Sequence, residues 1–316
     1  MAIYVNPAEY DLLMRVDSNT RGHTAWFFFK VSNATPKQKI KFNIINFGKK
    51  YLLYKDGMKP YVFKKSVGKW TQSGISINYA KRKFRYEACE NLYCEGLSFF
   101  YEFKDSEEAY FAYCVPYSYS YLLHRLEEFR NKAPHLIKIS YDNESTGGLP
   151  IPMLTISNFS TTNAEKSTIL CIGRLHPGES QGSWMMDGFI QQLLLPDSHY
   201  LRDRCVFRII PMVNVDGVVL GNFRTGIMGR DLNRCFHLVG KYNEISLIRK
   251  IAEESKPETF IDFHGHSSKK NVFIYGPDYK IEDRQYLMCR VFPKLISKKT
   301  EAFRYYSCMF RISGSK

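Results

Sequence analysis

Two short segments constrain this chain most, because each places metal-binding side chains directly after an apolar, strand-like run. The first is His176-Pro-Gly-Glu179 and the second is Asp262-Phe263-His264, which begins 83 residues after Glu179. When strands alternate with helices, ligands collect at the carboxyl ends of the strands, so the fold must bring these two strand ends together. Two imidazoles and a carboxylate are a ligand set of catalytic zinc, whose fourth position is open to water.

The spacing of the residues does not decide whether His264 or His266 is the third metal ligand. His264 and His266 are two positions apart, and alternation along an extended segment places both on one side. Asp262 is a candidate for orienting a ligand histidine or for capping the sheet edge. The pattern therefore predicts one zinc ion held by His176, Glu179 and one of the two later histidines.

The blocks between the two segments carry groups that suit the end of a peptide. An arginine presents a planar fork of donors that matches a carboxylate, and an asparagine amide adds a neutral donor. Asn233-Arg234 can therefore grip a terminal carboxylate, and Arg224 can face a carbonyl on which charge develops. Three simpler interpretations compete. Arg230 and Asp231 could pair only with each other, Asn233-Arg234 could be an ordinary polar turn, and Asn214 and Asp216-Gly217 could only shape a turn.

The first part of the chain is rich in short aromatic and β-branched runs separated by turn signals, which predicts an antiparallel β-sandwich. A helix is expected at 119–132, because Leu122, Leu126 and Phe129 follow helical spacing. Strands and helices then alternate, which predicts an α/β domain with helices on both faces of a mixed sheet. We expect the β-sandwich and its linking helix at 1–135 and the α/β domain at 136–316. The expected strands are 26–29, 39–45, 61–63, 74–79, 97–103, 110–115, 136–141, 151–157, 167–172, 204–211 and 259–263, and the further helices are 183–195 and 243–254.

Composition limits the cellular location of the chain, the state of its cysteines and the charge of its partners. The start of the chain lacks a basic stretch followed by an apolar run, and no segment approaches the ~18 apolar residues of a membrane helix. We therefore expect an intracellular protein that does not act at a membrane. The eight cysteines form no Cys-x-x-Cys pair, so reduced structural thiols are expected rather than a cysteine zinc site. The net charge of +14 suits an acidic partner, either a glutamate-rich tail or nucleic acid.

Taken together, these blocks resemble the metallocarboxypeptidases, and more closely the cytosolic carboxypeptidases that trim glutamates from protein C-termini such as those of tubulin. The resemblance implies that His176, Glu179 and His264 hold the zinc ion, that Arg224 is catalytic, and that Asn233 and Arg234 bind substrate. It implies acidic tails rather than nucleic acid as partners, and a cytosolic location with microtubule or cilium association. The matching blocks are 40–46, 55–60, 176–179, 214–218, 229–234 and 263–266.

The same resemblance places a catalytic glutamate and a substrate-closing tyrosine after a stretch like Phe303–Arg311, and this sequence ends at Lys316. We therefore expect either a carboxypeptidase in incomplete form or a catalytically inactive zinc module that binds acidic C-termini. A further alternative is a zinc deacylase acting on a small amino-acid derivative, against which only the resemblance of the large β-rich first region argues.

Overall fold

The computed structural model describes residues 1–83, 93–161, 166–238 and 240–312. It forms two compact units, Met1–Gly265 and His266–Lys316. The first unit contains two hydrophobic cores, one in a β-rich region and one in an α/β region. Cys89 lies outside the described residues, and the seven described cysteines are free thiols.

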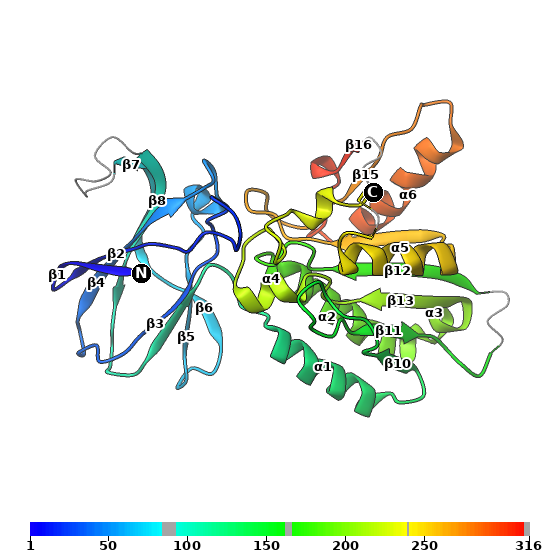
Figure 1. Cartoon of the computed structure of the whole chain (residues 1–316), viewed down its shortest axis with the longest axis horizontal. Coiled ribbons are helices and arrows are strands. Elements are labelled where there is room, and N and C mark those ends of the chain that lie inside the picture. The colour runs from blue at the N-terminus through cyan, green and yellow to red at the C-terminus, as the bar shows by residue number, and fades with distance from the viewer. Residues whose placement is uncertain (84–92, 162–165, 239, 313–316) are drawn as a thin grey trace. The chain divides into compact units, whose positions relative to one another are not determined.

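The β-rich region consists of two sheets (Figure 1). Neighbouring strands are antiparallel except for β2 and β4, which run parallel. In order across the first sheet, the strands are β1 (Ala2–Asn6), β2 (Glu9–Leu12), β4 (Lys39–Phe47), β8 (Tyr93–Glu102) and β7 (Ile75–Lys83). In the second sheet they are β3 (Phe28–Val31), β9 (Ala109–Ala112), β5 (Tyr61–Lys64) and β6 (Trp70–Gln72).

Aromatic side chains from both sheets form the core between them. The ring of Phe42 in β4 lies 5.5 Å from that of Phe99 in β8 and 5.3 Å from that of Phe111 in β9, centroid to centroid. All three side chains are buried. Aromatic rings contribute large apolar areas and favour tilted contacts at such distances. The predicted β-sandwich is therefore confirmed, with the parallel β2–β4 pair as an addition that the sequence did not indicate.

The α/β region is built on a mixed sheet of five strands. Pairing is parallel where β12 meets β13 and β14, and antiparallel in the other two pairs. Leu170, Cys171 and Ile172 are consecutive in β12 and fully buried. Because successive side chains point to opposite faces, both faces of the sheet are covered. The strand order is β10 (Ile137–Ser140), β11 (Met153–Ile156), β13 (Cys205–Ile210), β12 (Ser167–Gly173) and β14 (Thr259–Phe263).

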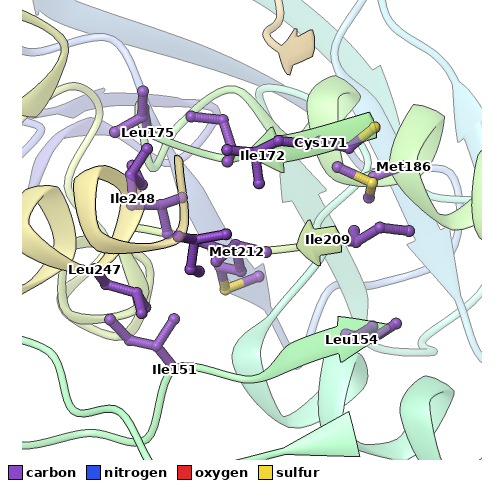
Figure 2. Close-up of a cluster of buried hydrophobic side chains, with 14 of the residues drawn as sticks. Ile151, Leu154, Cys171, Ile172, Leu175, Met186, Ile209, Met212, Leu247 and Ile248 are labelled. Atoms are coloured by element: carbon purple, nitrogen blue, oxygen red, sulfur yellow. The ribbon is translucent and has the colours of Figure 1, made fainter. Parts of the chain in front are cut away.

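Helices supply the layers over this sheet (Figure 1). Figure 2 shows two helix side chains, Met186 of α2 and Ile248 of α5, in one buried cluster with side chains of the sheet. The sheet residues include Ile172 of β12 and Ile209 of β13. The longer helices are α1 (Tyr119–Lys132), α2 (Ser180–Leu194) and α5 (Asn243–Ser255). The shorter ones are η1 (Leu53–Asp56) in the β-rich region and η4 (Pro196–Ser198), α3 (His199–Arg204), α4 (Val215–Leu220) and η5 (Leu232–Arg234) in the α/β region.

The predicted α/β architecture is confirmed, and α1 and β14 have the bounds that the sequence indicated. Strands β1 and β2 were not predicted, although Ala2 to Val5 in β1 are apolar. Leu122, Leu126 and Phe129 of α1 pack in the core of the α/β region. The domain boundary after residue 135 stays a prediction.

An ion pair between the half-buried Arg125 and the buried Asp187 connects α1 to α2. The guanidinium of Arg125 donates from Nε and Nη2 to the two carboxylate oxygens of Asp187, at 2.9 and 3.0 Å. The hydroxyl of Tyr117 donates to the same carboxylate at 3.0 Å. Removing one partner of a buried pair leaves an uncompensated charge, so this contact fixes the position of α2, whose N-terminal end carries Glu179.

The second unit, His266–Lys316, contains α6 (Arg284–Lys299), η6 (Tyr305–Ser307) and the parallel pair β15 (Tyr275–Pro277) and β16 (Met309–Ile312). Across the described parts of the chain, every helix is too short or too polar to cross a bilayer.

The first turn of α2 approaches the end of β14 so closely that only glycine fits at position 182. A Cβ added to Gly182 would lie 2.6 Å from the carbonyl oxygen of Phe263. We predict that Gly182→Ala lowers the free energy of unfolding by about 1–3 kcal/mol, because the helix or the strand end must shift. Denaturant unfolding monitored by circular dichroism measures it.

Gly188, on the same helix, is the matched control, because a Cβ there meets nothing within 4 Å. Gly188→Ala should leave stability unchanged or raise it by up to ~1 kcal/mol through helix propensity. Equal effects of the two substitutions would show that the close approach at Gly182 does not determine the packing.

Candidate metal and substrate site

The two predicted ligand segments meet because their strands are neighbours. Strands β12 and β14 pair in parallel, with Gly173 opposite Phe263. His264 follows Phe263 directly, and His176 follows Gly173 by three residues. Both imidazoles therefore leave the same edge of the sheet, at the carboxyl ends of adjacent parallel strands, which is where α/β sheets place their ligands.

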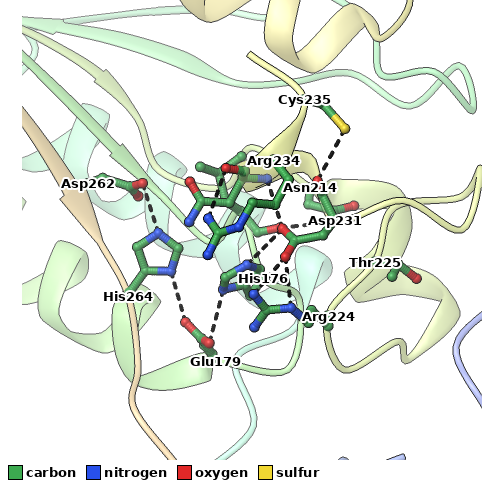
Figure 3. Close-up of polar contacts among 12 residues, drawn as sticks. His176, Glu179, Asn214, Arg224, Thr225, Asp231, Arg234, Cys235, Asp262 and His264 are labelled. Atoms are coloured by element: carbon green, nitrogen blue, oxygen red, sulfur yellow. Dashed lines mark hydrogen bonds and ion pairs between the residues drawn. The ribbon is translucent and has the colours of Figure 1, made fainter. Parts of the chain in front are cut away.

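His176, Glu179 and His264 form a compact group that could hold a metal ion. One ligand atom from each lies within 4.8 Å of the others. Nδ1 of His176 is 3.0 Å from one oxygen of Glu179, and Nδ1 of His264 is 2.9 Å from the other (Figure 3). Two imidazole nitrogens and a carboxylate, gathered from the segments after β12 and β14, are a donor set that suits zinc.

The outer nitrogens of both histidines are engaged by carboxylates. Nε2 of His176 is 3.0 Å from Asp231, and Nε2 of His264 is 2.8 Å from Asp262. Carboxylates at this position fix the tautomer and the ring orientation of a ligand histidine. With a metal bound, each Nε2–H would donate to its carboxylate and leave the lone pair of Nδ1 for the metal. This arrangement of the residues fits a zinc ion.

The electrostatics of the group follow from these contacts. Burial would raise the pKa of Glu179, but hydrogen bonds from His176 and His264 outweigh it and hold that pKa far below its usual range. Burial also opposes ionisation of Asp231, and its contacts with His176 and Arg224 lower its pKa to about 2. Burial would lower the pKa of His264, whereas Asp262 and Glu179 raise it to about 9. Without a metal, His264 is therefore protonated at neutral pH.

Arg174, at the end of β12, braces the loop that carries the first two ligands. It is buried, and its guanidinium donates to the carbonyls of Pro177 and Tyr117 and to the hydroxyl of Ser183, at 2.8–3.0 Å. Burial lowers the pKa of Arg174 to about 10, so it stays charged at neutral pH. Its φ of 61° is a left-handed conformation that costs energy in a non-glycine residue. The three hydrogen bonds hold the backbone in that conformation.

Asp231 joins the metal group to the side where substrate would bind. While Oδ1 contacts His176, Oδ2 accepts from Nε of Arg224 at 2.8 Å and lies 2.6 Å from Nη2 (Figure 3). The interpretation that Asp231 pairs only with Arg230 is therefore wrong, because Asp231 contacts His176 and Arg224. Arg224 is held beside the metal group by a shared carboxylate.

Asn233 and Arg234 lie on η5, directly after Asp231. The amide hydrogen of Asn233 donates to Asp231 at 3.0 Å, which fixes the turn. Arg234 is exposed, and its Nη1 donates to the carbonyl of Asn233 at 3.3 Å. The side-chain oxygen of Asn233 is buried and has no hydrogen-bond partner among the described residues. Both side chains keep hydrogen-bonding capacity for a ligand, and their roles stay predictions.

Asn214 and Asp216 hold turns and loops of the backbone, as the interpretation of these residues as turn-forming predicts. Asn214 accepts from the amide of Gly217 at 3.0 Å, and its own amide donates to the carbonyl of Leu175 at 3.0 Å. Asp216 accepts from the hydroxyl of Ser145 at 2.6 Å and from the amide of Gly147 at 2.8 Å. These contacts connect the segment after β13 to the segment that leads to His176 and to the turn at residues 145–147.

Asp17, far away in the sequence, fixes the backbone around Arg224. Its buried carboxylate accepts from the amides of Phe223, Arg224 and Thr225, at 2.6–2.8 Å. The hydroxyl of Thr225 donates to it at 3.2 Å. A segment between β2 and β3 of the β-rich region thus fixes the backbone position from which the side chain of Arg224 extends. No motif around Asp17 signalled this role.

His266, the competing histidine, belongs to the second unit. Its Nδ1 accepts from the amides of Ser268 and Lys269, at 3.2 and 3.0 Å, and its ring lies 5.5 Å from that of Phe273. Through these contacts, His266 stabilises the turn at residues 266–269. The metal group in the described residues contains His264 instead.

Two family models match the chain in order. Residues 3–100 match the cytosolic carboxypeptidase N-terminal domain, and residues 122–276 match zinc carboxypeptidases. The second match contains His176, Glu179 and His264. The site and the fold thus define a protein of the zinc carboxypeptidase class.

Curated relatives narrow the class. Cytosolic carboxypeptidase 2 of Danio rerio is 36% identical over 100% of this chain and 46% of the relative. The human protein of that name is 35% identical over 100% of the chain and 37% of the relative, and mouse cytosolic carboxypeptidase 3 is 33% identical over 98% and 32%. The chain belongs to the cytosolic carboxypeptidase family of zinc carboxypeptidases. It spans less than half the length of each of these relatives.

Solved structures agree on the fold. A metallo-carboxypeptidase from Burkholderia cenocepacia has a TM-score of 0.80 at 20% identity, over 99% of this chain and 80% of that one. A metallo-carboxypeptidase from Pseudomonas aeruginosa, in complex with (2-guanidinoethylmercapto)succinic acid, has a TM-score of 0.77 at 22% identity, again over 99% and 80%. At these identities the likeness concerns the fold.

Zinc binding should release a proton near neutral pH. A metal takes the neutral imidazole, and His264 in the metal-free protein has a pKa of about 9. Below that pH its proton must leave, whereas Glu179 is already ionised and releases none. We expect about one proton per zinc from His264 at pH 7, and fewer above pH 9. Calorimetry in two buffers of different ionisation enthalpy measures it.

His264→Ala should lose the metal, and His266→Ala is the matched control that should keep it. Elemental analysis after dialysis gives the stoichiometry. Loss of zinc in the His266 variant alone would mean that the third ligand is misassigned.

Asp17→Asn should destabilise the protein by about 1–3 kcal/mol, because an amide nitrogen would face backbone donors and leave one without an acceptor. Asp56→Asn, an exposed carboxylate in the same region, should cost less than ~0.5 kcal/mol. Denaturation midpoints provide the comparison. Equal midpoints for the two variants would rule out this role of Asp17.

Proposed function

We propose that this protein is a zinc carboxypeptidase of the cytosol that removes C-terminal glutamate from acidic protein tails such as those of tubulin, with one zinc ion at His176, Glu179 and His264. The observation that carries the proposal is the continuous chain of contacts from Asp262 through the three ligands to Asp231 and Arg224 (Figure 3). It places a metal group and a guanidinium side by side. Association with microtubules or cilia is part of the proposal.

The chemistry divides among named groups. Zinc, when bound, supplies a Lewis acid that polarises a carbonyl and acidifies water. Arg224, oriented by Asp231, stabilises negative charge that develops on the carbonyl oxygen. Arg234 and Asn233 hold the free α-carboxylate, which selects the last peptide bond over internal ones. Asp231 and Asp262 keep both imidazoles in the orientation that a metal needs.

The acidic side chains of the site among the described residues are all engaged. Glu179 belongs to the metal group, and Asp231 and Asp262 hold the Nε2 atoms of the two histidines. None of them is assigned as the general base, whose contribution is typically ~10²–10⁴-fold. A second candidate function therefore stands beside hydrolysis: a zinc-containing module that binds acidic C-termini without cutting them.

Acidic tails suit the charge of the chain. The formal net charge is +14, and the excess of basic residues lies in the β-rich region and in the second unit, whereas residues 136–265 are close to neutral. A positive field raises the rate of encounter with an acidic segment, and the carboxylate-binding pair then provides specificity for its end. We do not expect nucleic acid or a membrane as a partner.

A glutamate-rich peptide should bind more tightly with a free C-terminus than with an amidated one. Because Arg234 provides a charged, two-pronged contact, Arg234→Ala should reduce the affinity for the free peptide about tenfold and abolish the preference. The amidated peptide should bind both proteins equally. Fluorescence anisotropy at two salt concentrations separates this specific contact from general attraction, which salt screens.

Arg230→Ala is the matched control, since Arg230 is exposed and its loss changes the net charge equally. Equal affinity of the unmutated protein for free and amidated peptides would refute recognition of the terminus. Turnover of the free peptide, abolished by a chelator, favours the carboxypeptidase; tight binding without turnover favours the module.

A further inference from the structure

A lysine from the β-rich region reaches the metal and substrate site. Lys49 follows β4 and is half-buried. Its Nζ lies 4.7 Å from the centroid of the Phe223 ring, the residue directly before Arg224. The carbonyl of Lys49 accepts a hydrogen bond from the hydroxyl of Tyr79 in β7, which anchors its backbone to the sheet. The ammonium is therefore held in place beside the loop of Arg224.

Phe223 connects this lysine to the metal loop. A Cβ added to Gly178, which lies between His176 and Glu179, would come within 2.5 Å of the Phe223 ring. The amide of Gly178 donates to the carbonyl of Phe223 at 2.8 Å. The ring of Phe223 is buried and packs in the core of the β-rich region, 6.2 Å from that of Tyr113. An ammonium stacked on this ring is attracted by its face and stays close to both loops.

Two charges of the site act on Lys49. Burial lowers its pKa, the carboxylate of Glu179 raises it, and the guanidinium of Arg224 lowers it. Lys49 and Arg224 are thus neighbouring cations that repel each other, and Glu179 offsets part of that repulsion. A divalent cation held by Glu179 would neutralise that carboxylate. An anion placed near Lys49 would then be favoured.

The position of Lys49 indicates which part of a substrate it would meet. Arg234 and Asn233 are suited to the terminal carboxylate, and Arg224 to the carbonyl of the bond that is cut. The ring on which Lys49 stacks belongs to the residue directly before Arg224 and lies against Gly178 of the metal loop, which puts the ammonium on the carbonyl side of the site. The substrate residue that contributes this carbonyl is the penultimate one, so we expect Lys49 to meet its side chain.

We propose that the ammonium of Lys49 forms a subsite for the side-chain carboxylate of the penultimate residue of the substrate. This inference rests on the proposed function and adds a second selection to it, for two acidic residues in succession. The β-rich region then contributes a specificity residue to a site whose metal ligands all come from the α/β region.

The test uses the full chain and short peptides that end in Glu-Glu or Gln-Glu. A ketomethylene group replaces the last amide, so that binding is measured without cleavage. We expect the unmutated protein to prefer Glu-Glu about tenfold, in the range of one charged hydrogen bond. Lys49→Gln should abolish this preference, and Lys49→Arg should retain most of it. Lys50→Gln, an exposed neighbour with the same change of charge, should leave it intact.

The outcomes separate the two proposals. If the unmutated protein binds free and amidated Glu-Glu peptides equally, the proposed function fails. If it distinguishes them while Lys49→Gln and Lys50→Gln show the same preference for Glu-Glu, only the Lys49 subsite is refuted. A preference that depends on the last residue alone also refutes it. Zinc content and circular dichroism of each variant confirm that the fold is intact.

Discussion

The parallel pairing of β12 with β14 is the constraint on which the site depends. The register that sets Gly173 opposite Phe263 also sets the distance between the two imidazoles, whose ring centroids lie 4.8 Å apart. A slip of one residue would turn His264 to the other face of the sheet. Burial of both faces of β12 specifies the register strongly, so the geometry of the metal group is determined by the hydrophobic core rather than by the loops alone.

Charge is balanced around this edge by a series of carboxylates with distinct partners. Glu179 lies between the histidines, and Asp231 and Asp262 lie behind them. Asp231 also engages Arg224, so that the ligand and the charge-stabilising group share one support. Buried charges are tolerated when they are paired and hydrogen-bonded, and each of these carboxylates meets that condition. Shared support means that a disturbance of Asp231 reaches both functions at once.

Much of this arrangement could be predicted from the sequence, and the reasons for the exceptions are physical. The helix at 119–132 and the strand at 259–263 have strong local periodicity, and both were found with their bounds. Strand β2 depends on a parallel pairing with β4, which a local pattern does not reveal, whereas β1 pairs with β2 across the short turn at Pro7 and Ala8 and was overlooked. The metal group was predictable because its ligands follow apolar strands. Asp17 and Lys49 were missed because their importance comes from contacts with Phe223, 206 and 174 residues further along the chain, and neither lies in a recognisable motif.

The contact of Asp17 with the loop at 223–225 has a consequence for the order of folding. The residues it joins are 206–208 positions apart, so the loop closes only after a large entropy loss that earlier packing must offset. The metal ligands belong to one core and can assemble within it. The guanidinium of Arg224 has its partner Asp231 within the α/β region, whereas its backbone gains the support of Asp17 only when the segment that carries Asp17 has docked. The two supports of this one residue come from different parts of the chain, so the substrate side of the site is complete only when both regions have folded.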